Sequence, residues 1–265
     1  LQCISMLVPQ PNAHSVRRNL LMSLRAGAEL HAAPGMLSTI LATVWQLGKH
    51  RFAQGRFPYV IPPGGSSPVG MLGFVGAVHE LKMQIDSGEL PEPDYVYAAS
   101  GSMGTVAGLL LGFQAAGVKT KVVAVRVTAR QYSSLRKARR FFHAAQGLLR
   151  RADPAFPDGA FPADAFEFRH EFYGGEYARY TEEGMRAVRR LRETEGVGLE
   201  GTYTGKTFAA LLADAASGRL RGKTALFWNT YNSVDFQDDI QGLDYHALPR
   251  AFHRYFEEAV QPLDR

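Results

Sequence analysis

Apolar residues recur along the chain in two alternating patterns, and together they predict strands that alternate with helices. Short apolar runs such as residues 3–8 and 121–127 are typical of buried strands, and charged residues flank the second run, as expected for a buried parallel strand. Longer segments carry apolar residues at helical spacing, for example Val16, Leu20 and Leu24.

In chain order, the pattern predicts strands over 2–8, 29–32, 59–61, 94–99, 121–127 and 223–228, and helices over 15–26, 36–52, 69–85, 106–116, 181–194, 206–217 and 245–259. Residues 153–165, rich in Pro, Phe and Ala, are expected to form a long irregular loop. Repeated β-α units with short connections indicate an α/β protein with an open, mostly parallel sheet and helices on both faces.

The composition places the chain among folded proteins. Its 265 residues are 46% hydrophobic and 21% charged, which allows one large or two modest domains and argues against disorder. The single cysteine, Cys3, excludes a disulfide framework and a cysteine-rich metal site. No apolar run reaches the roughly 18 residues that span a bilayer, and no signal-peptide pattern opens the chain, so we expect a cytoplasmic protein with no membrane partner.

The net charge of +5 is carried mostly by arginine, with 23 Arg against 7 Lys. The densest basic cluster, at residues 136–140, lies on an expected helix beside Phe141 and Phe142. A solvated helix face is the favoured interpretation, and a phosphate or nucleic-acid patch is the alternative. We therefore expect no nucleic-acid partner.

A strand, a glycine-rich turn and a helix follow one another over residues 95–111. Gly101 and Gly104 allow close approach of the backbone, Ser102 and Thr105 add hydroxyls, and the helix directs its N-terminal amides at the turn. The turn has neither the P-loop nor the dinucleotide spacing. A phosphate cradle is favoured over a tight structural turn.

A second turn, over residues 62–67, also connects an expected strand to a helix and contains Ser66 and Ser67. Ligands collect at the carboxyl ends of strands in open α/β sheets, so we expect both turns to face one crevice. An ordinary helix cap is an equal alternative for this turn alone. The eight histidines form no metal-ligand spacing and no nucleophile elbow is present, so no metal site and no serine-hydrolase site is expected.

Four stretches in collinear order resemble one enzyme family. They are Pro-Gly-Gly-Ser at 63–66, Ser-Gly-Ser-Met-Gly-Thr at 100–105, Glu-Gly followed by Tyr-Thr-Gly-Lys at 200–206, and the polar segment 229–233. Their order over about residues 2–236 resembles the D-cysteine desulfhydrase and 1-aminocyclopropane-1-carboxylate deaminase family. The resemblance implies a two-domain fold-type-II pyridoxal 5′-phosphate (PLP) enzyme, similar in fold to the tryptophan synthase β-subunit, that acts on a small amino acid by β-elimination or deamination.

The resemblance also implies roles for particular residues. The cofactor phosphate would be held by Gly101, Ser102, Met103, Gly104 and Thr105, with Met103 in the place of a family glycine. Thr204 would face the pyridine nitrogen, where the deaminases carry a glutamate, and this difference favours desulfhydrase-like chemistry.

Two tyrosines and a substrate pocket complete the implied site. Tyr203 would lie beside the reacting substrate and Tyr177 would be a second active-site tyrosine, although the glycines that flank it in the family are Glu176 and Ala178 here. An ordinary packed tyrosine is the alternative for each. The pocket would be lined by Ser66, Ser67, Asn229 and Thr230, where Asn229 departs from the family's histidine.

The family's Schiff-base lysine has no counterpart among the seven lysines, since only Lys206 lies in a family motif and there it is not that residue. The abrupt start at Leu1 favours an N-terminally incomplete chain that is inactive alone. The alternative is a degenerate relative that binds a phosphate-bearing small molecule without turnover. A third possibility is a partner subunit that contributes half of a site to a complete chain. On this interpretation residues 1–57 are the remainder of a small domain and residues 58–265 are a large PLP-binding domain with a C-terminal helix. The resemblance also implies a homodimer.

Overall fold

A computed structural model describes residues 2–232 and 234–264. The chain divides into two compact units, one formed by residues 1–60 with 233–265 and the other by residues 61–232. The second unit contains the turns singled out in the sequence.

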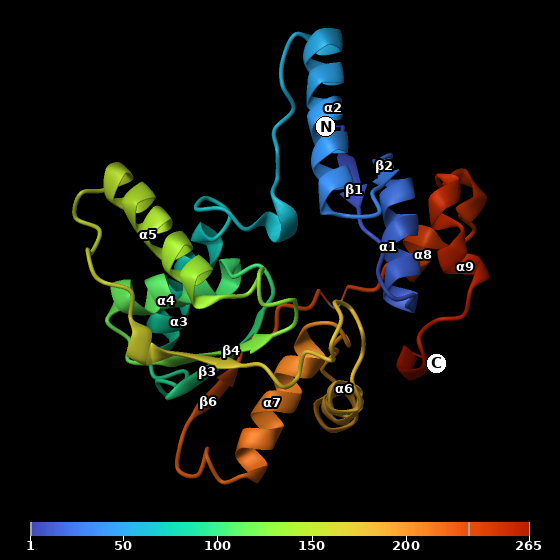
Figure 1. The fold of residues 1–265 in the computed structure, drawn as a ribbon. Helices are drawn as coiled ribbons and strands as arrows, with labels where there is room; N and C mark the ends of the chain where they lie inside the picture. The colour runs from blue at the N-terminus through green and yellow to red at the C-terminus, as the bar shows by residue number, and fades with distance from the viewer. Residues whose placement is uncertain (1, 233, 265) are drawn as a thin grey trace. The chain divides into compact units, whose positions relative to one another are not determined.

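The second unit is built on a four-stranded sheet in the order β5-β4-β3-β6, with all neighbours parallel (Figure 1). Its strands are β3 (Tyr95–Ser100), β4 (Lys121–Arg126), β5 (Phe166–Arg169) and β6 (Ala225–Phe227). The register pairs Tyr95 with Lys121 on one side and with Ala225 on the other. The predicted open parallel sheet is confirmed.

Helices cover both faces of this sheet, because successive side chains of a strand point to opposite faces. On one face Val96, Ala98 and Val122 pack against α3, α4 and α5, and on the other Tyr97 and Val123 pack against α6 and α7 (Figure 1). These helices are α3 (Leu72–Asp86), α4 (Gly104–Ala116), α5 (Leu135–Ala152), α6 (Glu182–Glu195) and α7 (Thr204–Ala216). Burial on both faces explains why β4 is a continuous apolar run.

The first unit pairs two short parallel strands and carries the C-terminal segment. Its elements are β1 (Ile4–Leu7), α1 (His14–Arg25), β2 (Glu29–Ala32), α2 (Met36–Gln54), α8 (Gln237–Ile240) and α9 (Arg254–Glu257). Gln261 N–H donates to the Asn12 carbonyl at 2.9 Å, and Gln10 N–H donates to the Tyr255 hydroxyl at 3.2 Å. The C-terminal segment therefore belongs to the first unit, whereas the sequence assigned it to the large domain.

Helix α2 reverses the usual orientation of an amphipathic helix. Trp45 is 71% exposed and Phe52 is 92% exposed, whereas Gln46 and His50 are buried. The Gln46 amide Nε2 lies 2.9 Å from Nε2 of His31 on β2, so the polar side of the helix faces the strands of its own unit.

Two predicted elements are wrong, and one strand was not predicted. The strand expected at 59–61 is wrong: the segment has no strand pairing, and Tyr59 and Ile61 are exposed, in a stretch bordered by prolines that restrict the backbone. Strand β5 was not predicted, because its four residues directly follow the irregular 153–165 loop. The helix expected at 245–259 is also wrong, since Pro249 interrupts the pattern and leaves only 3₁₀ turns and α9.

No helix in the described ranges is long and apolar enough to cross a membrane.

A buried ionic network fastens α7 to the sheet. The carboxylate of Asp214 on α7 accepts hydrogen bonds from the Tyr97 hydroxyl at 2.6 Å, from the Arg169 guanidinium and from Arg219 at 3.3 Å. Arg219 also pairs with Glu167 on β5 at 2.6 Å. Because Asp214 is only 5% exposed, its charge is balanced inside the protein and not by water.

Replacing Asp214 should destabilise the second unit strongly. Asp214→Asn keeps the shape but leaves Arg169 without its buried counterion, so we expect a loss of about 3 kcal/mol in the free energy of unfolding. The control Asp86→Asn removes the exposed Lys82–Asp86 pair of α3 and should change stability by less than about 0.5 kcal/mol. Urea denaturation of both variants measures the difference, and equal effects would refute the role assigned to the network.

Candidate functional site

The two predicted turns are in contact. One follows β3 over residues 100–105 and the other contains the 3₁₀ turn Pro63–Gly65 ahead of α3, and the Ser66 and Ser102 Oγ atoms lie 2.5 Å apart. A Cβ at Gly104 would lie 2.5 Å from Ser66 Oγ, and one at Gly64 would lie 2.6 Å from Ser102 Oγ. Glycine at both positions is therefore what allows the turns to approach this closely.

The turn after β3 presents free amides. Within the part of the chain that the structure describes, the main-chain N–H groups of residues 102–106 have no hydrogen-bond acceptor. They form the N-terminus of α4, where the helix dipole favours negative charge. Such a group of donors is suited to bind a phosphate.

Met103 takes a backbone conformation that normally requires glycine. Its φ is +74°, in the left-handed region, and its side chain is 1% exposed. The Ser100 hydroxyl donates to Met103 Sδ at 3.0 Å and the Ser133 hydroxyl lies 3.4 Å from the same sulfur. The side chain thus turns into the core and leaves the cradle lined by main chain.

The two predicted tyrosines meet beside this cradle. A Cβ built on Gly101 would lie 3.6 Å from Tyr203 Cε1, and the Tyr203 and Tyr177 hydroxyls are hydrogen-bonded to each other. Their rings are T-shaped, with centroids 6.1 Å apart. The structure therefore brings together the turn after β3 and both tyrosines.

Burial, reinforced by the nearby Tyr177 hydroxyl, raises the pKa of Tyr203 well above its usual range. Tyr203 consequently stays protonated at neutral pH. It can donate a hydrogen bond or a proton there, but it cannot act as a phenolate base.

Glu200 organises the segment that carries Tyr203, a role that was not predicted for it. Its carboxylate accepts the N–H groups of Thr202 and Tyr203, each at 2.6 Å, and of Thr204 at 2.8 Å. An acidic residue just ahead of a helix is the signal for such a cap.

Thr204 closes the same cap. Its hydroxyl accepts the Glu200 N–H at 3.0 Å, and the residue is 1% exposed. The hydroxyl therefore faces Glu200, and its expected role at a pyridine nitrogen stays a prediction.

Two buried cations lie close to the tyrosine-bearing segments. Lys206 on α7 is fully buried, its Nζ donates to the Tyr173 carbonyl at 2.8 Å, and burial lowers its pKa to about 8 against the opposing effect of Glu200. The Arg126 guanidinium at the end of β4 lies 4.4 Å from the centroid of the Tyr173 ring and donates to His170 at 3.0 Å. Neither cation pairs with a carboxylate among the described side chains.

The remaining predicted residues lie around the edge of this region. The Ser67 hydroxyl accepts the Gly70 N–H at 3.0 Å within the turn, whereas α3 begins after Met71 and has no side-chain cap. Asn229 and Thr230 are exposed and follow β6, at the same carboxyl edge of the sheet as the turn after β3. Across the described residues, neither of them makes a hydrogen bond to that turn.

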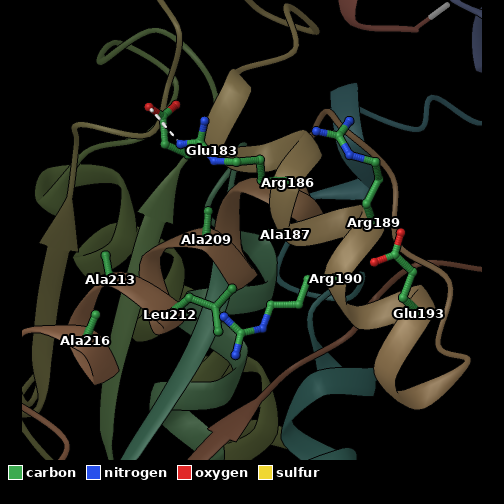
Figure 2. A pocket seen from close by; sticks show the side chains of 10 residues that line it. All are labelled: Glu183, Arg186, Ala187, Arg189, Arg190, Glu193, Ala209, Leu212, Ala213 and Ala216. Atoms are coloured by element: carbon green, nitrogen blue, oxygen red, sulfur yellow. Dashed lines mark ion pairs between the residues drawn. The ribbon is translucent and has the colours of Figure 1, made fainter.

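A hollow of about 540 Å³ lies elsewhere, between α6 and α7 (Figure 2). Arg186 and Glu183 on its rim pair at 3.7 Å, and Ala209 and Leu212 lie within it. None of the predicted site residues lines this hollow. Nor does the described chain hold a group of three His, Cys, Asp or Glu side chains arranged to bind a metal ion.

Comparison with known proteins gives consistent relatives. A Pyrococcus horikoshii protein, named as a candidate 1-aminocyclopropane-1-carboxylate deaminase, is 35% identical over 180 residues, which are 67% of this chain and 50% of that protein. A D-cysteine desulfhydrase of Serratia proteamaculans is 33% identical over 169 residues, which are 64% of this chain and 48% of that protein. The chain thus spans about half the length of the curated relatives it matches.

Solved structures agree on the fold. A crystal structure of an ACC deaminase homologue matches with a TM-score of 0.68 and 28% identity, over 91% of this chain and 70% of that one. A fungal L-serine ammonia-lyase from Rhizomucor miehei matches with a TM-score of 0.53, over 97% of this chain and 75% of that one; at 13% identity it supports the fold alone. The family model described as pyridoxal-phosphate dependent enzyme matches residues 5–230. The chain therefore belongs to the pyridoxal-phosphate dependent enzymes and has their fold-type-II architecture.

Proposed function

We propose that the protein serves a PLP-dependent lyase reaction on a small amino acid, of the D-cysteine desulfhydrase type. The single observation that carries the proposal is the cradle of free amides at the start of α4, with Tyr203 beside it. Family membership supports the cofactor, and the names of the relatives support the reaction class.

The residues of the cradle fit the phosphate of PLP. Free N–H groups and the hydroxyls of Ser102 and Thr105 supply donors, while the Met103 side chain points away into the core. When bound, PLP withdraws electrons from the Cα atom of the amino acid. A neutral hydroxyl at Thr204, where the deaminases carry glutamate, supports a simple elimination over opening of a cyclopropane ring.

The tyrosine pair is suited to hold and move a proton. Tyr203 stays protonated near neutral pH and lies beside the cradle, so it can donate to the sulfur atom that leaves the substrate. The Tyr177 hydroxyl, hydrogen-bonded to that of Tyr203, would orient it.

A second candidate is a degenerate relative that binds a phosphate-bearing molecule without turnover. The observation that favours it is that none of the seven lysines lies in the family's Schiff-base motif. We further propose a cytoplasmic homodimer, which rests on the family resemblance.

The product of the complete gene should convert D-cysteine and water into pyruvate, ammonia and hydrogen sulfide. It should act much less on 1-aminocyclopropane-1-carboxylate, whose products would be 2-oxobutyrate and ammonia. Tyr203→Phe should lower kcat for D-cysteine about 100-fold or more, because the proton donor is lost. The control Tyr59→Phe changes a side chain that is 83% exposed and should have no effect. A gene product with an intact mass of 29.2 kDa and no turnover of either compound would support the degenerate relative instead.

The cradle should bind the phosphate of the cofactor even without a covalent bond. Pyridoxine 5′-phosphate carries the ring and the phosphate but no aldehyde, so its affinity reports the cradle alone. Gly104→Ala places a methyl group 2.5 Å from Ser66 Oγ and should weaken binding at least about tenfold in equilibrium dialysis. Gly76→Ala on α3, where a Cβ meets no atom within 4 Å, is the matched control. Equal binding of pyridoxine without phosphate would contradict the phosphate assignment.

The 265-residue chain alone should not hold PLP covalently. Borohydride reduction of the chain mixed with PLP, followed by peptide mapping, should give no stoichiometric label on any of the seven lysines. One fully labelled lysine would overturn this expectation and identify the reactive residue.

A further inference from the structure

The segment that carries Tyr177 follows a demanding path. Within five residues, Gly174, Gly175 and Ala178 all have left-handed φ angles, of 79°, 84° and 61°. This conformation is sterically unfavourable for Ala178, because its Cβ lies too close to the following carbonyl oxygen. The path therefore has to be held by contacts with the rest of the unit.

The contacts that hold this segment are concentrated at its two ends. Phe172 and Tyr180 are buried at the two ends of the segment, while Gly174, Gly175 and Glu176 between them are exposed. On either side of these exposed residues, the Tyr173 carbonyl accepts a hydrogen bond from Lys206 Nζ, and the Tyr177 hydroxyl is hydrogen-bonded to that of Tyr203.

The Lys206 side chain reaches this segment at Tyr173 and Gly174. Its Nζ lies 2.8 Å from the Tyr173 carbonyl oxygen, 5.9 Å from the centroid of the Tyr173 ring and 3.8 Å from the point where a Cβ on Gly174 would lie. Lys206 lies in the first turn of α7, three residues after Tyr203, which is the N-cap residue of this helix.

The burial of this lysine calls for an explanation. Lys206 is 0% exposed and forms no ion pair within the described side chains, whereas an apolar side chain of the same length would avoid the desolvation cost of an ammonium. What the ammonium gains in this position is a charge-assisted hydrogen bond to one main-chain carbonyl.

We infer that Lys206 is a positioning residue whose ammonium anchors residues 173–177 to the first turn of α7 and so maintains the Tyr177–Tyr203 hydroxyl contact. The inference rests on the proposed function only where it gives that contact a purpose in catalysis. The anchoring itself is a property of the folded chain.

The anchor should weaken as the pH rises. The groups that face the ammonium are the Tyr173 ring and the Glu200 carboxylate, with Arg126 on the same ring. Above pH 8 Lys206 becomes neutral in the folded protein, while in the unfolded chain it stays charged to about pH 10.4. Over that window the unfolded state binds more protons, so this group makes global stability rise with pH while its bond to the Tyr173 carbonyl weakens.

Hydrogen exchange of the folded chain tests the anchor. Lys206→Met removes the charge and the donor, and should lower the protection of the amides of 173–177 at pH 7 at least about tenfold, relative to α4. Lys206→Arg should restore most of the protection. Lys223→Met, which removes an exposed cation paired with Asp94 at 2.9 Å, should leave the segment unchanged.

A pH series on the unmodified chain gives a second test that no folding defect can obscure. After correction for intrinsic exchange, protection of 173–177 should fall between pH 7 and 9 while that of α4 does not. Unchanged protection in Lys206→Met, or no pH effect on the unmodified segment, would overturn the inference. Neither result depends on turnover. Failure of the proposed enzyme activity would therefore leave the anchor intact, and loss of the anchor would leave the proposed activity to be tested by its own assay.

Discussion

The parallel pairing of β3 with β4 and β6 is the constraint on which the site depends. Parallel strands bring their carboxyl ends to one edge, so the turn after β3, the start of the loop after β4 and the segment after β6 begin side by side. The Thr128 hydroxyl, just beyond β4, donates to the Gly101 carbonyl at 3.0 Å and fastens two of these strand ends together. Without this pairing, the turn after β3 and the segments after β4 and β6 would no longer meet at one edge of the sheet.

Buried charges in the second unit are compensated in two different ways. Around the buried Asp214, the partly buried Arg169 and Arg219 are each paired with a carboxylate, and the network holds α7 to the sheet. Around Tyr173, Lys206 and Arg126 instead direct their charge at carbonyl oxygens, an imidazole and an aromatic ring. The first arrangement consists of ion pairs that fasten one helix to the sheet. The second depends on the protonation of the Lys206 amine and lies close to the tyrosine pair.

The sequence was informative where local chemistry determined the outcome. The glycine spacing and the following apolar helix were enough to predict the turn after β3, because both requirements are local. The contact of Tyr177 with Tyr203 was accessible only through family resemblance, since 26 residues separate them. The Lys206 anchor was not predicted, because its partner is a main-chain carbonyl, and a main-chain carbonyl leaves no signal in the sequence. The C-terminal segment was misplaced because its docking depends on main-chain contacts with Asn12, far away in the chain.

Met103 has a consequence for how this loop can vary in evolution. A left-handed φ excludes β-branched residues, and the buried site between Ser100 and Ser133 has the shape of an unbranched thioether. A glycine at this position would relieve the strained φ but leave an internal void, so it is the core, and not the ligand, that favours methionine here.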